Sequence, residues 1–415
     1  MKSFVEYSSD SDFSIHNIPF GVAVFNKEYI GCCTRIGDQI VDLATLYDYG
    51  YFEEIEGLID NVFEAYTLNE FIELGKPITN AVRQKIQELL QEDSILSKDE
   101  KTIEEAFYDL DKVKMMMPVH IPNYTDFYSS IEHATNVGKM FRDPANALLP
   151  NWKHLPVGYH GRASSIVVSG TEINRPKGQM KPADVEKPVF GPCKQLDFEL
   201  EIAFIINKNT EMGESISTSE AEDAIFGMVI FNDWSARDIQ SWEYVPLGPF
   251  LAKNFGSSVS PWVVTLEALE PFRTASPEQD PEVLEYLKFE GDKNYDINLE
   301  VYIQPENGEQ NLISESNYKH MYWNMTQQLA HHTVNGCNIE VGDMYASGTI
   351  SGSDPKSFGS MLELTWRGQN PITLSNGEER KFINDNDTVT MKAWAEKDGV
   401  RVGFGEVNGK VIPAK

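Results

Sequence analysis

Polar and apolar residues alternate most regularly at residues 197–201. Asp197, Glu199 and Glu201 are separated by single apolar residues, and an apolar run at 202–206 follows. A period of two predicts a β-strand that places the three carboxylates on one face, about 7 Å apart. Two charges at that separation repel by about 2 kcal/mol at an effective dielectric of about 20. The pattern favours two interpretations equally, a face that binds a hard divalent cation and a solvated acidic face.

Similar runs predict strands elsewhere in the chain. Segments rich in β-branched, aromatic or alternating apolar residues lie at 21–25, 29–33, 39–43, 228–231, 361–366, 389–395 and 400–404. Turn residues predict hairpin connections at 26–28, 37–38 and 397–399. Asp233 follows the buried run at 228–231, and Glu363 lies within the strand predicted at 361–366.

Helical periodicity is confined to a few segments. Apolar residues spaced by three and four predict a helix through residues 82–90. Capping-box patterns that begin at Ser97 and Ser217 predict two more helices, the second ending near Gly227. The remainder of the chain is rich in strands, with many Gly and Pro residues between them.

The length of 415 residues suggests two or three domains. The run Met-Met-Met-Pro at 115–118 separates the helical part from the strand-rich remainder. We therefore expect an N-terminal domain over residues 1–118 and a second domain over residues 119–415.

Composition limits the classes of partner. The formal charge of −29, from 35 basic and 64 acidic residues, argues against binding to nucleic acid or anionic membranes. Four cysteines without a C-x-x-C motif, and the absence of a signal-peptide pattern, lead us to expect reduced thiols and a cytoplasmic protein. No apolar run approaches the roughly 18 residues of a membrane span.

Common catalytic signatures do not occur in the sequence. It contains no G-x-S-x-G, P-loop or H-E-x-x-H motif. His331 and His332 have no cysteine or third histidine nearby, so we interpret them as a surface or core pair. Four other blocks mix acids, bases, aromatics and glycines in a way that is unusual for a simple core. These blocks are 126–142, 158–162, 232–253 and 348–363.

Three long motifs in these blocks are specific. They are Tyr-Thr-Asp-Phe-Tyr-Ser-Ser at 124–130, His-Leu-Pro-Val-Gly-Tyr-His-Gly-Arg-Ala-Ser-Ser at 154–165 and Asn-Asp-Trp-Ser-Ala-Arg-Asp-Ile-Gln at 232–240. Through these three motifs, the chain resembles the fumarylacetoacetate hydrolase family. The resemblance is strongest over about residues 126–405, and it is looser at the N-terminus, where Ser-Asp-Phe-Ser-Ile-His-Asn-Ile-Pro-Phe-Gly occupies 11–21.

The resemblance implies a fold and an activity. The fold would be mostly β with some helix, with a small N-terminal SH3-like barrel domain and a C-terminal mixed β-sandwich roll that forms a homodimer. The activity would be metal-dependent hydrolysis of 4-fumarylacetoacetate to fumarate and acetoacetate, the final step of tyrosine and phenylalanine catabolism. The substrate would be a small diketo acid.

The resemblance also implies roles for individual residues. Ca²⁺ would be bound by Asp126, Glu199, Glu201 and Asp233. A second, Mg²⁺-like site would use Asp233 with the backbone near Lys253 and Ser257. His133 would be the base that activates water, oriented by Glu363, and the oxyanion would be stabilised by Arg237, Gln240 and Lys253. Substrate would be bound by Tyr128, Arg142, Tyr159, Gln240, Tyr244 and Thr349. The resemblance gives Asp197 no role, so it is either a supporting residue near the site or a surface residue.

These residue types suit the chemistry. Cleavage between two carbonyl groups expels an enolate, whose charge a divalent cation stabilises as a Lewis acid. Water must lose a proton to attack the other carbonyl, and a histidine oriented by a carboxylate is a suitable base. Arg, Lys and Gln side chains would provide donors for the tetrahedral oxyanion, and Arg142 would provide a bidentate clamp for a substrate carboxylate.

Alternatives remain open at this point. The chain could belong to another branch of the same superfamily, such as an acylpyruvase or an oxaloacetate decarboxylase, or it could be a non-enzymatic acidic calcium-binding protein. Single residues also have simpler interpretations: Arg237 as an ordinary ion pair with Asp238, and Glu363 as a solvent-facing strand residue.

Overall fold

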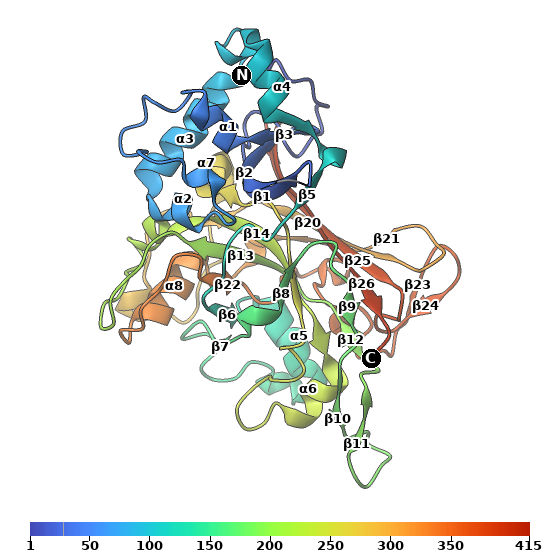
Figure 1. Ribbon diagram of the computed structural model, residues 1–415. Helices are drawn as coiled ribbons and strands as arrows, with labels where there is room; N and C mark the ends of the chain where they lie inside the picture. Colours follow the sequence, from blue (N-terminus) through green and yellow to red (C-terminus); the bar gives the residue numbers. More distant parts are fainter. Residues whose placement is uncertain (28) are drawn as a thin grey trace.

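The N-terminal part of the chain forms a curled, five-stranded antiparallel sheet. In the computed structural model, which describes residues 1–27 and 29–415, the strand order is β4-β3-β2-β1-β5 (Figure 1). The strands are β1 (Phe20–Phe25), β2 (Tyr29–Ile36), β3 (Gln39–Asp42), β4 (Phe107–Asp109) and β5 (Val113–Met115). This half barrel is the expected SH3-like element. The predicted pairing of the first two strands is confirmed, although Glu28 of the predicted turn lies outside the described residues.

Short helices accompany this sheet. They are α1 (Leu43–Asp48), α2 (Asn69–Glu73), α3 (Lys76–Leu89) and α4 (Glu100–Ala106). Helix α3 confirms the helix predicted through 82–90, and it buries Val82, Ile86 and Leu89. The predicted cap at Ser97 is wrong, because the side chain of Asp99 accepts a hydrogen bond from the backbone N–H of Thr102 at 3.2 Å and so caps α4.

A mixed sheet forms the centre of the molecule. Its strands lie in the order β7-β6-β22-β13-β14-β16-β8, with β17 also paired to β14. They are β6 (Tyr124–Phe127), β7 (Gly158–His160), β8 (Ile166–Val168), β13 (Leu200–Ile206), β14 (Ile225–Asp233), β16 (Ser257–Val259), β17 (Val264–Thr265) and β22 (Met344–Ala346). All of β14 is buried, as predicted for 228–231. The helix predicted from Ser217 is reduced to one 3₁₀ turn, Ala221–Ala224, because β14 already begins at Ile225.

A second sheet packs against one face of the central sheet. Its order is β21-β20-β25-β26-β9, with β9 (Ile173–Asn174), β20 (Asn298–Gln304), β21 (Asn311–Asn317), β25 (Thr388–Lys397) and β26 (Val400–Ile412). The late hairpin of β25 and β26 is therefore confirmed. Ile202 and Phe204 of β13 share a core with Met391 of β25, whereas Ala203 and Ile205 pack on the other face with the N-terminal sheet. The two faces of β13 thus contact different layers.

The remaining helices and strands are short. They are α5 (Ile131–Phe141), α6 (Arg237–Glu243), α7 (Leu266–Leu269), α8 (Met325–Thr333), α9 (Met361–Leu364), β10 (Lys177–Met180), β11 (Val189–Pro192), β12 (Leu196–Asp197), β15 (Ser235–Ala236), β18 (Arg273–Thr274), β19 (Asn294–Tyr295), β23 (Ile372–Thr373) and β24 (Glu379–Arg380). The strand predicted at 361–366 is wrong, because its first four residues form helix α9. Within the described ranges, no helix is both long and apolar enough to cross a membrane.

Candidate active site

Four buried carboxylates meet at one end of the central sheet. Asp126 lies in β6, Glu201 lies in β13, Asp233 ends β14, and Glu199 immediately precedes β13. One oxygen from each of the four lies within 4.8 Å of the others. We call these residues the carboxylate cluster. The structure thus brings together the four residues for which the family resemblance implied Ca²⁺ binding.

Strand pairing explains how distant residues converge. Asp126 is opposite Ala346 of β22, and Ala346 is in turn beside Ala203 of β13. Residues two apart in a strand share a face, so Glu201 and Ala203 are on the same side of the sheet. Glu201 is opposite Phe231 of β14, two residues before Asp233, so side chains from β6, β13 and β14 approach one another on this face.

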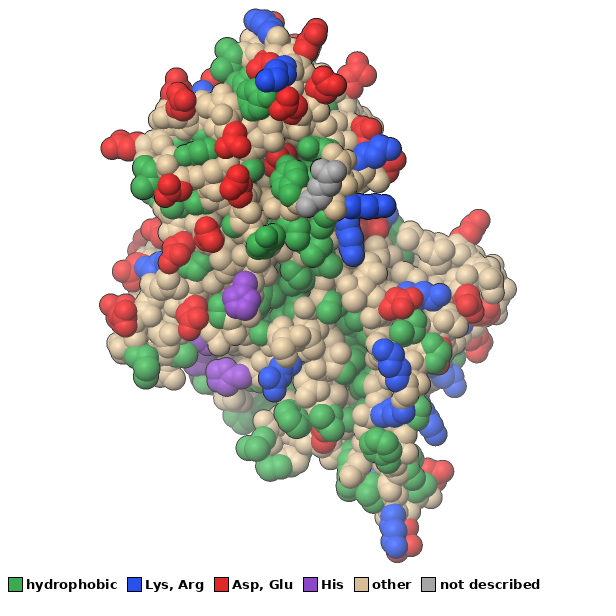
Figure 2. Space-filling model, viewed as in Figure 1, with side chains coloured by type: hydrophobic (Ala, Val, Ile, Leu, Met, Phe, Trp, Pro, Cys, Tyr) green, Lys and Arg blue, Asp and Glu red, His purple; other side chains and the backbone are tan. Residues whose placement is uncertain are grey.

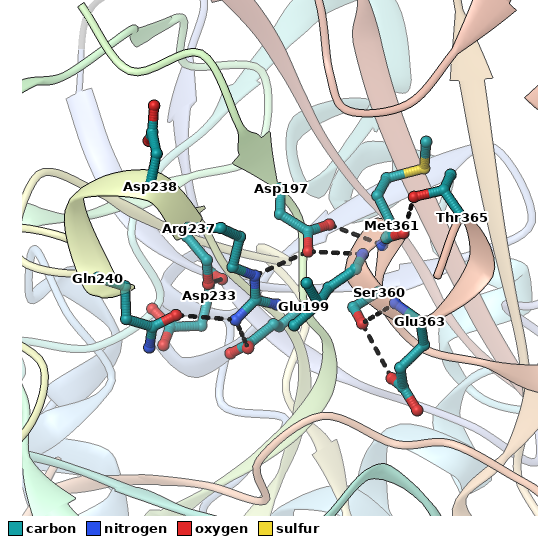
Figure 3. Close-up of polar contacts among 12 residues, drawn as sticks. Asp197, Glu199, Asp233, Arg237, Asp238, Gln240, Ser360, Met361, Glu363 and Thr365 are labelled. Carbon is teal, nitrogen blue, oxygen red and sulfur yellow. Dashed lines mark hydrogen bonds and ion pairs between the residues drawn. The ribbon is translucent and has the colours of Figure 1, made fainter. Parts of the chain in front are cut away.

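Two basic side chains, Lys253 and Arg237, form ion pairs on one side of the cluster. The Nζ atom of Lys253 contacts Glu199 and lies 2.6 Å from Oδ2 of Asp233. Nη1 of Arg237 lies 2.8 Å from Oε1 of Glu199 (Figure 3). Burial raises the pKa of Glu199, but Lys253 and Arg237 outweigh burial and lower this pKa to about 2. Glu199 is therefore ionised. Burial disfavours the charged form of Lys253, but Asp233 and Glu199 outweigh burial and raise its pKa.

On the other side of the cluster, burial and repulsion outweigh the compensating charge of Lys253. Burial and the neighbouring carboxylates raise the pKa of Asp126 and of Glu201 well above their usual ranges. Oδ1 of Asp126 and Oε1 of Glu201 are buried without a hydrogen-bond partner in the described part of the chain. Buried polar atoms normally have partners. These two oxygens fit a divalent cation that prefers carboxylate ligands.

A histidine and a carboxylate form a second unit beside the cluster. His133 lies in the first turn of α5, which Ser130 caps. Its Nδ1 atom lies 2.6 Å from Oε2 of Glu363. Burial disfavours the charged form of Glu363, but the contact with His133 and hydrogen bonds from neighbouring side chains lower its pKa. His133 also favours the ionised form of Glu199, which connects this pair electrostatically to the cluster.

Other predicted site residues surround these two units. The hydroxyl of Tyr159 donates to Oδ2 of Asp233 at 3.1 Å, and Oγ of Ser257 donates to Oδ1 of Asp233 at 2.9 Å. The ring of Tyr128 meets the ring of His133 edge-on, with centroids 5.2 Å apart. Oε1 of Gln240 accepts a hydrogen bond from Nη1 of Arg237 at 3.2 Å.

Three predicted residues have weaker connections to the site. Nη2 of Arg142 donates to the carbonyl of Ala147 at 2.6 Å, and the side chain is exposed. Tyr244 follows α6 and is 51% exposed. Thr349 is buried, and its Oγ1 has no hydrogen-bond partner within the residues described. The first two residues therefore do not contact the cluster in this structure.

Several local interpretations from the sequence need correction. Asp197 and Glu201 do not share one strand, because β12 ends at Asp197 and β13 begins at Leu200. Asp197 is fully buried, so it is not a surface residue. Arg237 pairs with Asp197 and Glu199, which excludes an ordinary pair with Asp238. Glu363 is 1% exposed and does not face solvent.

The sequence analysis missed the residues that hold Glu363. Oγ of Ser351 and Oγ of Ser360 each donate to Oε2 of Glu363 at 2.9 Å, and Nδ2 of Asn136 donates to Oε1 at 3.0 Å. Two signals were available. Ser360 and Glu363 have capping-box spacing, and Asn136 lies one helical turn after His133 and therefore on the same face of α5.

A pocket of about 120 Å³ opens beside the cluster. Asp233, Lys253 and Tyr159 line it, together with His160 and Arg162. His160 and Arg162 belong to the sequence block 158–162, in which the resemblance implies a role only for Tyr159. The pocket provides access from solvent to the side of Asp233 that carries Lys253.

Comparisons with known proteins agree with the geometry. The family model for the fumarylacetoacetase N-terminal part matches residues 16–118, and that for the fumarylacetoacetate (FAA) hydrolase C-terminal part matches 123–412. The fumarylacetoacetase of Homo sapiens is 52% identical over 417 residues, covering 99% of each chain. That of Dictyostelium discoideum is 50% identical, covering 100% of this chain and 98% of the relative.

A solved structure shares the fold. The fumarylacetoacetate hydrolase from psychrophilic Exiguobacterium antarcticum has a TM-score of 0.53 at 18% identity, covering 96% of this chain and all of that chain. At this level of identity, the likeness concerns the fold alone. The family models and the full-length relatives show more, and the chain belongs to the fumarylacetoacetate hydrolase family.

Proposed function

We propose that this chain hydrolyses the carbon–carbon bond of 4-fumarylacetoacetate to give fumarate and acetoacetate, the final step of tyrosine and phenylalanine catabolism. One observation carries the proposal: the His133–Glu363 pair and the carboxylate cluster occupy one buried site. The names of the full-length relatives support the choice of substrate. A non-enzymatic calcium-binding protein would not need the histidine, Arg237 and Lys253 beside the carboxylates.

His133 acts as the general base in this proposal. Nδ1 is engaged by Glu363, so Nε2 takes the proton from a water molecule. The oxygen of this water bonds at the same time to the carbonyl carbon next to the fumaryl double bond. Cleavage then leaves the bonding electron pair on acetoacetate as an enolate. The proton returns from the imidazolium to this leaving group, and the products together contain the atoms of the substrate and one water.

The carboxylate cluster is suited to a divalent cation, which we infer to be Ca²⁺. Two ligands on opposite sides of Ca²⁺ lie about 5 Å apart, and the four oxygens lie within 4.8 Å of one another. The cluster contains only carboxylates, whereas Zn²⁺ sites usually include Cys or His. When bound, the cation supplies a Lewis acid that stabilises the charge of the leaving enolate.

We further propose a second, Mg²⁺-like site at Asp233, with Lys253 and Ser257. Support comes from the pairing of Ser257 with Asp233 across β16 and β14. In this structure the contacts to Asp233 are made by the side chains of Lys253 and Ser257, whereas the resemblance implied backbone groups. Counting the bound divalent ions per chain by elemental analysis tests this site, because one ion per chain would contradict it.

Charged and polar donors complete the proposed site. Arg237, Gln240 and Lys253 stabilise the oxyanion, and Arg237 has an Nη2 atom without a partner among the described residues. Tyr128, Arg142, Tyr159, Gln240, Tyr244 and Thr349 bind the substrate. Support for Thr349 is its buried, unpaired hydroxyl. Binding by Arg142 and Tyr244 requires these exposed side chains to turn toward the pocket.

We also propose a division into domains at residues 1–118 and 119–415, and a cytoplasmic homodimer. The separate N-terminal sheet supports the division. Apolar side chains on the β10–β11 hairpin and on the loop after α6 support the dimer (Figure 2), because Phe190, Leu247 and Phe250 are 74%, 96% and 62% exposed. Light scattering of the purified protein, compared with Leu247→Asp, tests the dimer.

Substrate choice is tested by offering three compounds to the purified, metal-loaded protein: 4-fumarylacetoacetate, an acylpyruvate and oxaloacetate. We expect fumarate and acetoacetate to form in equal amounts, with little turnover of the other two. No loss of fumarylacetoacetate, together with rapid cleavage of the acylpyruvate or decarboxylation of oxaloacetate, would overturn the proposal in favour of another superfamily activity.

A further inference from the structure

Asp197 accepts hydrogen bonds from two separate parts of the site (Figure 3). It ends β12 and is fully buried. On one side, its Oδ2 atom accepts a hydrogen bond from Nε of Arg237 at 2.8 Å. On the other side, its Oδ1 atom accepts from the backbone N–H of Met361 at 2.7 Å, and Oδ2 accepts from that of Leu362 at 3.0 Å.

The contact with Arg237 helps to fix the guanidinium group. Nε is held by Asp197, and Nη1 is held by Glu199 and Gln240. Because the guanidinium group is planar and rigid, contacts at Nε and Nη1 also fix the position of Nη2. Nη2 is buried and has no partner among residues 1–27 and 29–415. It is therefore the donor that remains available to a reacting carbonyl group.

The contacts with Met361 and Leu362 fix helix α9. This helix has only four residues, too few to be stable without tertiary contacts. Its first N–H groups have no partners within the helix, and they are satisfied by Asp197 and by Ser360, whose Oγ accepts from the N–H of Glu363. Glu363 is the third residue of α9 and holds Nδ1 of His133.

We propose that Asp197 is a positioning residue that sets the oxyanion-binding arginine and the base-orienting carboxylate relative to each other. The inference rests on the proposed function for the roles of Arg237 and His133, and it assigns to Asp197 a role that the resemblance did not give. The connection runs from Arg237 through Asp197 to α9, Glu363 and His133. Arg237 and His133, which act on the same carbonyl group of the substrate, are thereby held in place by the carboxylate of Asp197.

Asp197→Asn tests the connection with little change in shape. A carboxylate accepts on both oxygens, whereas an amide has one oxygen and one NH₂ group. In either orientation, the NH₂ group of Asn faces an N–H donor, from Met361 on one side or from Arg237 and Leu362 on the other. The variant therefore loses either the contact with Met361 or the contacts with both Arg237 and Leu362, and the side chain at position 197 no longer offers two accepting oxygens to the arginine and α9.

Asp387→Asn provides a matched control. Asp387 is 1% exposed, and it accepts from Nε and Nη2 of Arg380 at 2.8 and 2.9 Å and from the backbone N–H of Asn384 at 2.9 Å. It thus also joins a buried arginine to the backbone, but at the start of β25, outside the catalytic groups. Both variants should lower the melting temperature, which controls for a purely structural effect.

The kinetic experiment compares kcat and KM for 4-fumarylacetoacetate in five proteins: wild type, Asp197→Asn, Asp387→Asn, Glu363→Gln and the double variant Asp197→Asn/Glu363→Gln. We expect kcat to fall about 100-fold in Asp197→Asn, with a smaller change in KM, and to stay unchanged in Asp387→Asn. In the Glu363→Gln background, Asp197→Asn should lower kcat by less than about 10-fold, because part of the effect of Asp197 on kcat passes through Glu363. Equal kcat in the two Asn variants, or an additive double variant, would overturn the proposal.

A spectroscopic measurement tests the same role without turnover. The Nδ1 proton of His133 is assigned in the ¹H spectrum by its loss in His133→Ala. Its downfield signal should weaken or shift in Asp197→Asn and remain in Asp387→Asn. If wild type does not hydrolyse fumarylacetoacetate, the proposed function fails while this measurement still tests the positioning role. An unchanged His133 signal in Asp197→Asn would overturn that role.

Discussion

Nδ1 of His133 and Oε2 of Glu363 lie 2.6 Å apart in a buried part of the site. Four hydrogen-bond donors, from His133, Asn136, Ser351 and Ser360, converge on the carboxylate of Glu363. An ionised carboxylate only accepts hydrogen bonds, and the pKa of Glu363 is lowered. Neutral His133 therefore carries its proton on Nδ1 and presents the lone pair of Nε2, which is the form required of a base.

The first prediction concerns Glu363→Gln. The amide is similar in shape but uncharged, and it has one accepting oxygen. Nδ1 of His133 therefore meets either the NH₂ group, which favours the tautomer with the proton on Nε2, or a neutral oxygen, which no longer stabilises the imidazolium. We expect kcat to fall about 10³- to 10⁴-fold, as for other histidines held in the wrong tautomer, with little change in melting temperature. Steady-state kinetics check this, with the exposed Glu315→Gln as the control. Activity within about 10-fold of wild type would show that Glu363 does not orient the base.

The second prediction separates the base from the proposed metal site. In His133→Ala we expect kcat to fall at least about 1,000-fold, because general-base catalysis contributes about 10²- to 10⁴-fold. Calcium affinity, measured by calorimetry, should change by less than about threefold, because His133 is not part of the carboxylate cluster. His154→Ala, at an exposed position, serves as the control. Retained turnover would remove His133 from the role of base.

The third prediction concerns the stability of the metal-free protein. Glu201→Gln removes a carboxylate whose pKa is raised by burial and by neighbouring carboxylates. The four oxygens lie within 4.8 Å of one another, and two charges at that distance repel by roughly 3 kcal/mol at an effective dielectric of about 20. In chelator, the variant should therefore melt at a higher temperature than wild type, while losing the rise in melting temperature that Ca²⁺ gives to wild type.

Asp343→Asn controls for the loss of a buried carboxylate outside the cluster. Asp343 accepts backbone hydrogen bonds from Asn123 and Glu340, so its replacement should lower the melting temperature and preserve the response to Ca²⁺. A lower melting temperature of Glu201→Gln in chelator, or an undiminished response of this variant to Ca²⁺, would contradict the account of the cluster.

The fourth prediction concerns acid stability. Burial, with smaller effects from His160 and His331, lowers the pKa of His332 to about 4, and its Nδ1 atom lies 3.1 Å from the hydroxyl of Tyr345. The folded state thus favours neutral His332, while the unfolded chain gains a proton below about pH 6.5. The contribution of His332 to the free energy of unfolding is complete above that pH and is lost as the pH falls towards 4. The loss is at most about 3 kcal/mol.

Urea unfolding at pH 7 and at pH 4.5 checks this prediction. His332→Gln keeps an acceptor for Tyr345 and cannot gain a proton, so its free energy of unfolding should decrease less between the two pH values than that of wild type. An equal decrease in both proteins would show that His332 does not contribute to acid sensitivity.

Local patterns predicted those elements whose structure depends on nearby residues. The hairpin of β25 and β26, helix α3 and the buried strand β14 follow from periodicity and turn residues within each segment. The alternation at 361–366 misled, because the tertiary contacts of Glu363 and Asp197 hold these residues as a helical turn. The spacing of Ser360 and Glu363 was the better guide there.

The assembly of the site could not be derived from local pattern. Asp126 approaches Glu201 only because β22, more than 200 residues later than β6, lies between β6 and β13. Likewise, the groups that bind Asp197 come from α6 and α9, and its contact with Met361 spans 164 positions. Family resemblance identified the catalytic candidates, but long-range contacts were needed to assign Asp197.

Metal dependence of fumarylacetoacetate hydrolysis tests the central claim most directly. Fumarate release is measured from purified wild type, from protein stripped of divalent ions, and from stripped protein after Ca²⁺ is returned, with Glu201→Gln treated in parallel. We predict that stripping lowers the rate at least about 100-fold and that Ca²⁺ restores the rate in wild type but not in Glu201→Gln. An undiminished rate in protein shown by elemental analysis to contain no divalent ion would contradict the account.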